Sequence, residues 1–138
     1  MSESESPSSA GPTTCPCGSN ASYAQCCEPL HRGAPAANAE ALMRARYSAF
    51  ALDLHDYIER SWHSSTRPTD AEKAAAGAKP QWIGLRIKRH KVVDDDRAIV
   101  EFTARYRLNG RVSALHEISR FVREDGHWFY LDGKFPRR

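Results

Sequence analysis

Residues 97–124 read RAIVEFTARYRLNGRVSALHEISRFVRE. In this stretch β-branched and aromatic side chains alternate with polar ones on both sides of Asn109-Gly110, a dipeptide that favours a two-residue hairpin turn. With that turn Leu108 faces Arg111, which fixes every other pair across the two strands. The sequence therefore predicts an antiparallel hairpin with a defined register.

This register gives the predicted hairpin one apolar face and one polar face. Glu117 lies on the apolar face, opposite Phe102, where a carboxylate is out of place. His116 lies on the polar face. The other residues of the apolar face are Val100, Ala104, Tyr106, Ser113, Leu115, Ser119 and Phe121.

The same period of two continues on either side of the hairpin. It predicts four strands, over 82–93, 97–108, 111–123 and 127–131. Asp94-Asp95-Asp96 separates the first pair of strands, and Asp125-Gly126 is a second strong turn signal between the last pair. We expect a meandering antiparallel sheet, and the basic run from Arg86 to Lys91 is typical of a guarded sheet edge.

Helices are predicted before the sheet. Asn38 is a good amino-terminal cap for a helix that continues to Leu54, and a second short helix is expected from Asp56 to Trp62. Residues 64–79 predict a third short helix, a loop, or both. Helices followed by an antiparallel sheet predict an α+β fold in which the helices cover one face of the sheet.

Four cysteines lie close together before the first helix, in two pairs: Cys15 with Cys17, and Cys26 with Cys27. Four soft ligands in two close pairs are typical of a structural zinc site, and four thiolates leave no open position for catalysis. We expect one zinc ion, with Ser19 capping a short helix over 20–25. The alternative is a set of free cytosolic thiols or a redox pair, although a thioredoxin-like site has a different spacing.

The cysteine segment resembles the SEC-C motif, first known from the SecA translocation ATPase. Further stretches at 26–31, 41–50, 62–68 and 116–121 resemble the YchJ family of small bacterial proteins. That resemblance covers residues 15–133. It implies an amino-terminal zinc knuckle joined to a nuclear-transport-factor-2-like domain, in which a cone of helices packs on a curved antiparallel sheet.

The resemblance also divides the chain. The expected parts are a disordered tail over 1–14, the SEC-C zinc knuckle over 15–28, a linker over 29–37, the nuclear-transport-factor-2-like domain over 38–133 and a tail over 134–138. In SecA the basic flank of the motif meets the chaperone SecB and the ribosome. Here Asn20, Ala21 and Ser22 stand where lysines are usual, which does not favour a SecB-type partner.

Composition is that of an ordinary soluble globular protein. The chain has 138 residues, of which 41% are hydrophobic and 27% are charged. No stretch approaches the roughly 20 apolar residues that span a bilayer, and the first residues lack the pattern of a secretory signal. We expect a cytoplasmic protein that does not enter a membrane.

Nuclear-transport-factor-2-like domains commonly hold a pocket between the sheet and the helices. Glu117 is the candidate acid or base of such a pocket, and His63 and Arg67 are candidates for holding a small anionic ligand at its mouth. In the alternative interpretation Glu117 is buried against an arginine from the first helix, and His63 and Arg67 only cap the second helix.

Two hypotheses for function follow. In the first, the protein is not an enzyme: the knuckle docks a partner protein or the ribosome, and the larger domain binds a small ligand. In the second, it is a small enzyme in which Glu117 is the acid or base and His63, Arg67 or Arg120 orients the substrate. Trp62, Trp82 and Trp128 beside the basic run permit nucleic-acid stacking, but we expect them to be core or pocket walls and nucleic acid to be no partner.

Overall fold

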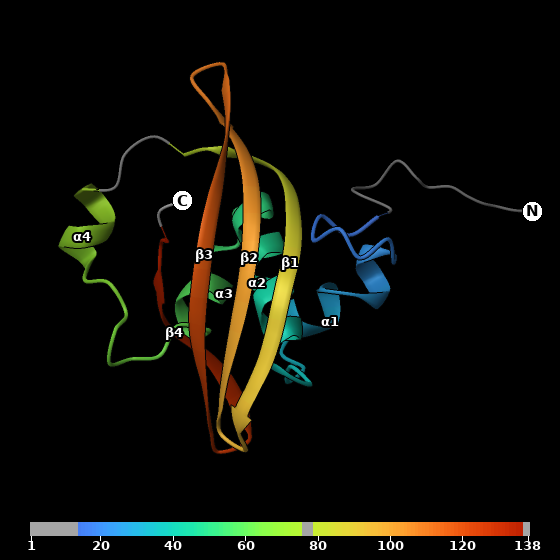
Figure 1. Cartoon of the computed structure of the whole chain (residues 1–138), viewed down its shortest axis with the longest axis vertical. Coiled ribbons are helices and arrows are strands. Elements are labelled where there is room, and N and C mark those ends of the chain that lie inside the picture. The colour runs from blue at the N-terminus through green and yellow to red at the C-terminus, as the bar shows by residue number, and fades with distance from the viewer. Residues whose placement is uncertain (1–13, 76–78, 137–138) are drawn as a thin grey trace, which may run out of the picture.

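The structure is a computed structural model that describes residues 14–75 and 79–136. It is an α+β fold in which one antiparallel sheet, with strand order β1-β2-β3-β4, has helices on one side (Figure 1). The strands are β1 (Gln81–Asp94), β2 (Arg97–Leu108), β3 (Arg111–Glu124) and β4 (His127–Lys134).

The predicted register of the central hairpin is confirmed. Leu108 pairs with Arg111 and Phe102 pairs with Glu117. Asn109 and Gly110 both have positive φ, at 54° and 77°, which is the conformation that a type I′ turn requires. The hairpin turn thus places Glu117 on the inner face of the sheet.

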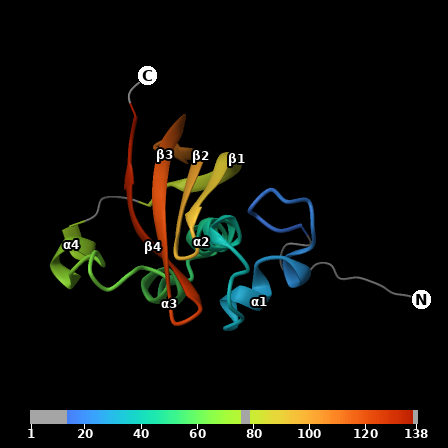
Figure 2. The ribbon, with the colours of Figure 1, turned by 60° about the horizontal axis from the view of Figure 1, so that its bottom comes forward.

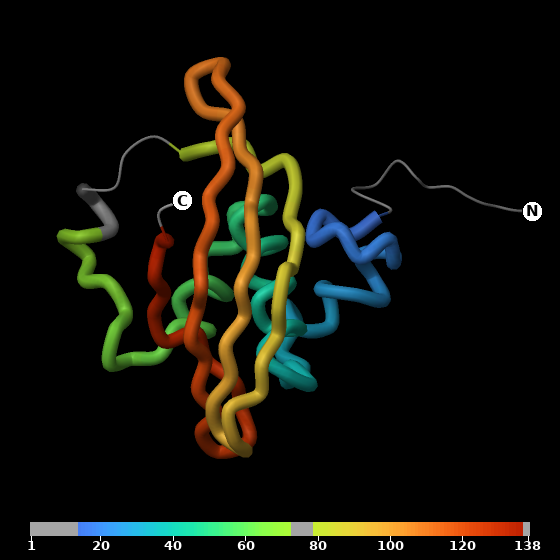
Figure 3. Tube along the Cα trace, viewed as in Figure 1, coloured from blue at the N-terminus to red at the C-terminus, as the bar shows by residue number. Residues whose placement is uncertain are grey.

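The strand β1 is an edge of the sheet, as the basic run predicted. Its pairing with β2 shifts at three places, after Trp82, after Ile87 and after Val92. Such bulges bend a strand and increase its twist, and the trace shows β1 bowed along its length, with the helices behind the sheet (Figure 3). The curvature leaves a concave face toward the helices.

The helix α2 (Ala39–Leu52) lies against this concave face. It begins as predicted, because the Asn38 side chain accepts a hydrogen bond from the Ala41 amide at 2.8 Å. It ends at Asp53, whose φ of 60° is left-handed, so Leu54 no longer belongs to it. The short helix α3 (His55–Arg60) follows.

Two predicted segments differ in extent. Of the stretch 64–79, α4 (Asp70–Ala75) is helical and 76–78 lie outside the described residues. The last strand reaches Lys134, and Phe135 contacts the inner cavity, so the expected tail over 134–138 begins too early. Of the expected tail over 1–14, Thr14 forms a β-bridge with Ser22, and 1–13 lie outside the described residues.

The amino-terminal segment holds two short helical turns, η1 (Tyr23–Gln25) and α1 (Glu28–His31). The expected helix over 20–25 is only three residues long and begins at Tyr23, because Asn20 has a left-handed φ of 70° and Ser22, not Ser19, caps η1. The predicted linker was also too long, since α1 occupies its first residues.

This segment packs beside α2 and β1 (Figure 2). Three of its cysteines, Cys15, Cys17 and Cys27, belong to the same buried cluster as the α2 residues Leu42 and Tyr47. One continuous core therefore joins the amino-terminal segment to the larger domain. None of the helices in the described residues combines the length and the apolar character that a membrane crossing needs.

Candidate metal centre and pocket

The four cysteine sulfurs converge on one point. Their Sγ atoms all lie within 4.8 Å of one another, with 3.6 Å between Cys17 and Cys26 and 3.9 Å between Cys26 and Cys27. Four sulfurs bound at about 2.3 Å around a tetrahedral zinc ion are separated by about 3.8 Å. A disulfide needs about 2.05 Å, and all four cysteines are free thiols. The donor set and its spacing therefore fit a tetrahedral metal ion.

The electrostatics of the cluster favour a cation at its centre. The hydrogen bond from the Cys27 thiol lowers the pKa of Cys17 to about 4, and the same bond raises the pKa of Cys27. Burial raises the pKa of Cys26. A divalent cation bound between the four sulfurs would stabilise all of them as thiolates.

Side chains of α2 hold the cluster in place. The Arg44 guanidinium donates to the Cys17 carbonyl oxygen at 3.0 Å and lies 3.9 Å from its sulfur. Ser48, which is fully buried, places its hydroxyl 3.4 Å from the Cys15 sulfur. Arg44 and Ser48 of this helix thus contact the cysteine cluster.

His31 forms a second contact between the amino-terminal cysteine segment and the larger domain. His31 of α1 lies 2.8 Å from the Ala45 carbonyl oxygen through Nε2, and the Tyr23 hydroxyl lies 2.7 Å from its Nδ1. Burial lowers the pKa of His31. The imidazole is therefore neutral, donating to Ala45 and accepting from Tyr23.

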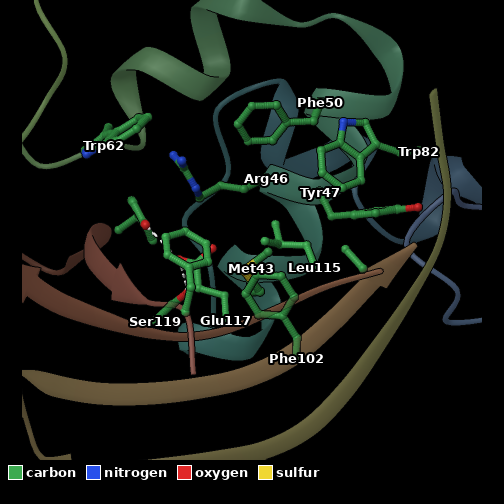
Figure 4. Close-up of a pocket in the computed structure, with 13 residues that line it drawn as sticks. Met43, Arg46, Tyr47, Phe50, Trp62, Trp82, Phe102, Leu115, Glu117 and Ser119 are labelled. Carbon is green, nitrogen blue, oxygen red and sulfur yellow. Dashed lines mark hydrogen bonds between the residues drawn. The ribbon is translucent and has the colours of Figure 1, made fainter. Parts of the chain in front are cut away.

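A cavity of about 230 Å³ lies on the other side of α2, between the helix and the concave face of the sheet. Figure 4 shows its walls, which come from α2, from the chain around Trp62 and from strands β1 to β4. Most of its lining is apolar: Met43, Tyr47, Phe50, Trp62, Trp82, Phe102, Ala104, Leu115, Tyr130 and Phe135. Three polar residues complete it: Arg46, Glu117 and Ser119.

Glu117 contributes a carboxylate to this cavity. Its Oε2 accepts hydrogen bonds from the Ser119 hydroxyl at 2.7 Å and from the Tyr130 hydroxyl at 2.8 Å. Burial, followed by the charge of Glu117, raises the pKa of Tyr130, so this phenol keeps its proton and donates. Of the two arginines considered as partners of Glu117, Arg46 lines the same cavity, where burial lowers its pKa and the charge of Glu117 partly offsets that effect. No ion pair joins Glu117 to Arg44 or to Arg46.

Arg46 contributes a cation to the same cavity. Its Nη1 donates to the Ile58 carbonyl oxygen at 3.0 Å and to the Ser61 hydroxyl at 2.7 Å. The guanidinium also lies over the rings of Tyr130, at 4.5 Å, and Trp62, at 5.1 Å. Burial lowers the pKa of Arg46 to about 10, which leaves it charged at neutral pH.

Comparison with known proteins agrees with this two-part arrangement. Residues 38–133 match the family described as "YchJ, middle NTF2-like domain", and residues 13–29 match the SEC-C motif. The chain is 51% identical over 125 residues to a UPF0225 protein of Bordetella parapertussis, an alignment that covers 88% of this chain and 92% of that protein. It is 49% identical over 137 residues to a UPF0225 protein of Ralstonia nicotianae, covering 92% and 94%. The chain belongs to the YchJ family.

Two solved structures resemble this YchJ family member. The solution structure of a SEC-C motif containing protein from Rhodopseudomonas palustris superposes with a TM-score of 0.79 at 35% identity, covering 90% of this chain and 99% of that one. The crystal structure of a SEC-C motif containing protein from Psychrobacter arcticus gives a TM-score of 0.73 at 30% identity, covering 91% and 84%. The SEC-C segment and the larger domain therefore occur together in these neighbours.

Other residues proposed from the sequence do not line the YchJ pocket. His63 is held between Glu124, at 2.8 Å, and Ser65, at 2.7 Å, and Arg67 donates to the Trp62 carbonyl oxygen at 2.9 Å. Arg120 pairs with Asp132 near the surface. The structure thus brings Glu117 to the pocket and leaves these three outside it.

Tyr130 is the polar pocket residue that sequence reasoning missed, whereas Arg46 was considered only as one of two arginines that could lie against Glu117. Arg46 stands three residues after Met43 and four before Phe50, which places it on the apolar stripe of the helix. This spacing was a usable signal, because a charged residue on an apolar stripe requires a buried partner or a ligand.

Proposed function

We propose that this YchJ family protein is a zinc-stabilised protein that binds a small ligand in the pocket of its nuclear-transport-factor-2-like domain. The zinc part of this proposal rests on the four cysteine sulfurs, which lie within 4.8 Å of one another; three of the four cysteines are buried. A closed four-thiolate site is structural, because no coordination position remains for substrate. Any small ligand therefore belongs in the cavity on the other side of α2.

Elemental analysis of the purified protein tests the zinc. We expect about one zinc ion per chain, and four thiols that react with a thiol reagent only after a chelator is added. The variant Cys26→Ser is expected to lose most of the metal, whereas Ala24→Ser, at an exposed neighbouring position, is expected to keep it. No zinc and four freely reactive thiols in the untreated protein would contradict the proposal.

Partner docking by the knuckle remains a prediction. The exposed residues of the knuckle include the stretch 18–22, which has no charged residue. A partner that docks there would have to use backbone and hydroxyl contacts. Capture of a partner that survives Cys26→Ser would speak against it.

A second function is favoured by the position of Glu117, which faces an open cavity. In this enzyme Glu117 removes a proton from a carbon next to a carbonyl group, and Arg46 holds the carbonyl oxygen on which negative charge develops. Acetophenone in heavy water provides a test: proton magnetic resonance should show its methyl protons exchanging faster with wild-type protein than without it. The variant Glu117→Gln should remove that acceleration, and an equal rate in both proteins would exclude Glu117 as the base.

A further inference from the structure

The pocket contains two buried, opposite charges that do not touch. Arg46 is 3% exposed and Glu117 is 7% exposed, and both line the cavity. Each is held by neutral groups: a carbonyl oxygen and a hydroxyl for the guanidinium, and two hydroxyls for the carboxylate. In residues 14–75 and 79–136 no ion pair joins either of them to another side chain.

Part of each charged group has no hydrogen-bond partner in residues 14–75 and 79–136. Both hydrogen bonds of Arg46 leave from Nη1, and both hydrogen bonds of Glu117 arrive at Oε2. Nε and Nη2 of Arg46 and Oε1 of Glu117 form no hydrogen bond with the described residues. None of these three atoms is among the fully enclosed polar atoms without a partner in that part of the chain, which are Trp62 Nε1 and His90 Nε2, and both charged side chains line the cavity.

A buried charge that lacks hydrogen-bond partners destabilises the folded protein. A ligand that supplies those partners recovers this free energy when it binds. A group that accepts a hydrogen bond from Arg46 and donates one to Glu117 matches both sites at once. The charges of the two residues cancel, so the pair favours a neutral polar group. A carboxylate ligand would meet the negative charge of Glu117, and an ammonium ligand would meet the positive charge of Arg46.

The size and walls of the cavity limit the rest of the ligand. A cavity of about 150 Å³ holds benzene, and drug-sized ligands occupy about 300 Å³ or more. The cavity here, at about 230 Å³, has room for one ring with a short substituent. Phe50, Trp82 and Phe102 offer ring faces and edges to such a body (Figure 4).

We propose that the pocket binds an uncharged, ring-sized apolar molecule that carries a carbonyl oxygen beside an N–H donor, of which a carboxamide on an aromatic ring is the simplest form. This inference rests on the proposed function, in which the pocket binds a ligand. The carbonyl oxygen accepts from Arg46, the N–H donates to Oε1 of Glu117, and the ring lies among the aromatic walls.

Three small probes test the proposal: benzamide, benzoate and toluene. Each is titrated into the zinc-loaded protein, and binding is followed by changes in the protein's backbone amide signals in nuclear magnetic resonance spectra. Benzamide should bind at least about tenfold more tightly than either of the others, since a hydrogen bond to a charged group is worth about one to two powers of ten in affinity. In Glu117→Gln the ratio of benzamide to benzoate affinity should fall at least about tenfold. The matched control is Glu101→Gln, which removes a carboxylate paired with His116 on the other face of the sheet and should leave that ratio unchanged.

The outcomes separate this inference from the proposed function. Toluene binding as tightly as benzamide, or a ratio that Glu117→Gln does not change, would overturn the inference and leave the pocket as an apolar site. A second outcome would overturn both this inference and the proposed ligand binding. In that outcome no probe binds, and Ala104→Leu, in the cavity wall, changes the spectra no more than Ala114→Leu, on the exposed side of β3. The comparison of the three probes on the wild-type protein requires no variant. It therefore tests the preference for a carboxamide even if Glu117→Gln does not fold.

Discussion

At the scale of single residues, Glu117 depends on a glycine. A Cβ atom at Gly133 would lie 2.7 Å from the Glu117 Cδ and closer still to Oε2, so no side chain fits there while the carboxylate keeps its place. Gly133→Ala is expected to displace the carboxylate, weaken its bonds to Ser119 and Tyr130, and lower the free energy of unfolding by about 1–3 kcal/mol in urea denaturation. Gly84→Ala, where a Cβ would meet nothing within 4 Å, is the control and should change it by less than about 1 kcal/mol. Equal effects of the two substitutions would show that Glu117 is not held as described.

At the scale of elements, the sheet was predictable and the surroundings of α2 were not. The turn signal at Asn109-Gly110 is local, and it alone determines the register that places Glu117 inside. For α2, Arg44 and Ser48 look like a solvent-facing side, yet Ser48 has no exposed surface because the cysteine segment covers it. That contact joins residues more than 25 positions apart, and no short-range pattern reports it.

The candidate site, like the fold, could be predicted from the sequence only in part. The cysteine cluster could be predicted because its four residues lie in one short segment, and the structure brings their sulfurs together. The pocket needs residues from α2, β3 and β4, and only Glu117 stood out because its register was already determined. Tyr130 acquires its role from its hydrogen bond to Glu117, and Arg46 from its contact with the ring of Tyr130. These long-range contacts cannot be derived from local sequence patterns.

At the scale of the whole molecule, His31 connects the cysteine segment to the helices. Its ring contacts Tyr23, the Ala45 carbonyl oxygen and the ring of Tyr57, at 4.8 Å between centroids. Burial lowers its pKa below the ordinary value of 6.5; the hydrogen bond to Ala45 and the charge of Glu28 oppose this effect, while the charge of Arg60 adds to it. A histidine that is harder to protonate when folded takes up its proton first in the unfolded chain.

The sign of the pH dependence follows. This contribution to stability is fully present above about pH 6.5 and is lost as the pH falls below that value toward the lowered pKa of the folded protein. His31→Gln, which keeps a donor for Ala45, should therefore show a smaller loss of unfolding free energy between about pH 7.5 and 5.5 than the wild type in excess zinc. His127→Gln, at an exposed position in β4, retains the cysteines and His31 and should follow the wild-type curve. Because all three proteins carry the same four cysteines, acid release of any metal bound there affects them alike. Parallel curves for wild type and His31→Gln would remove His31 as the source of the pH dependence.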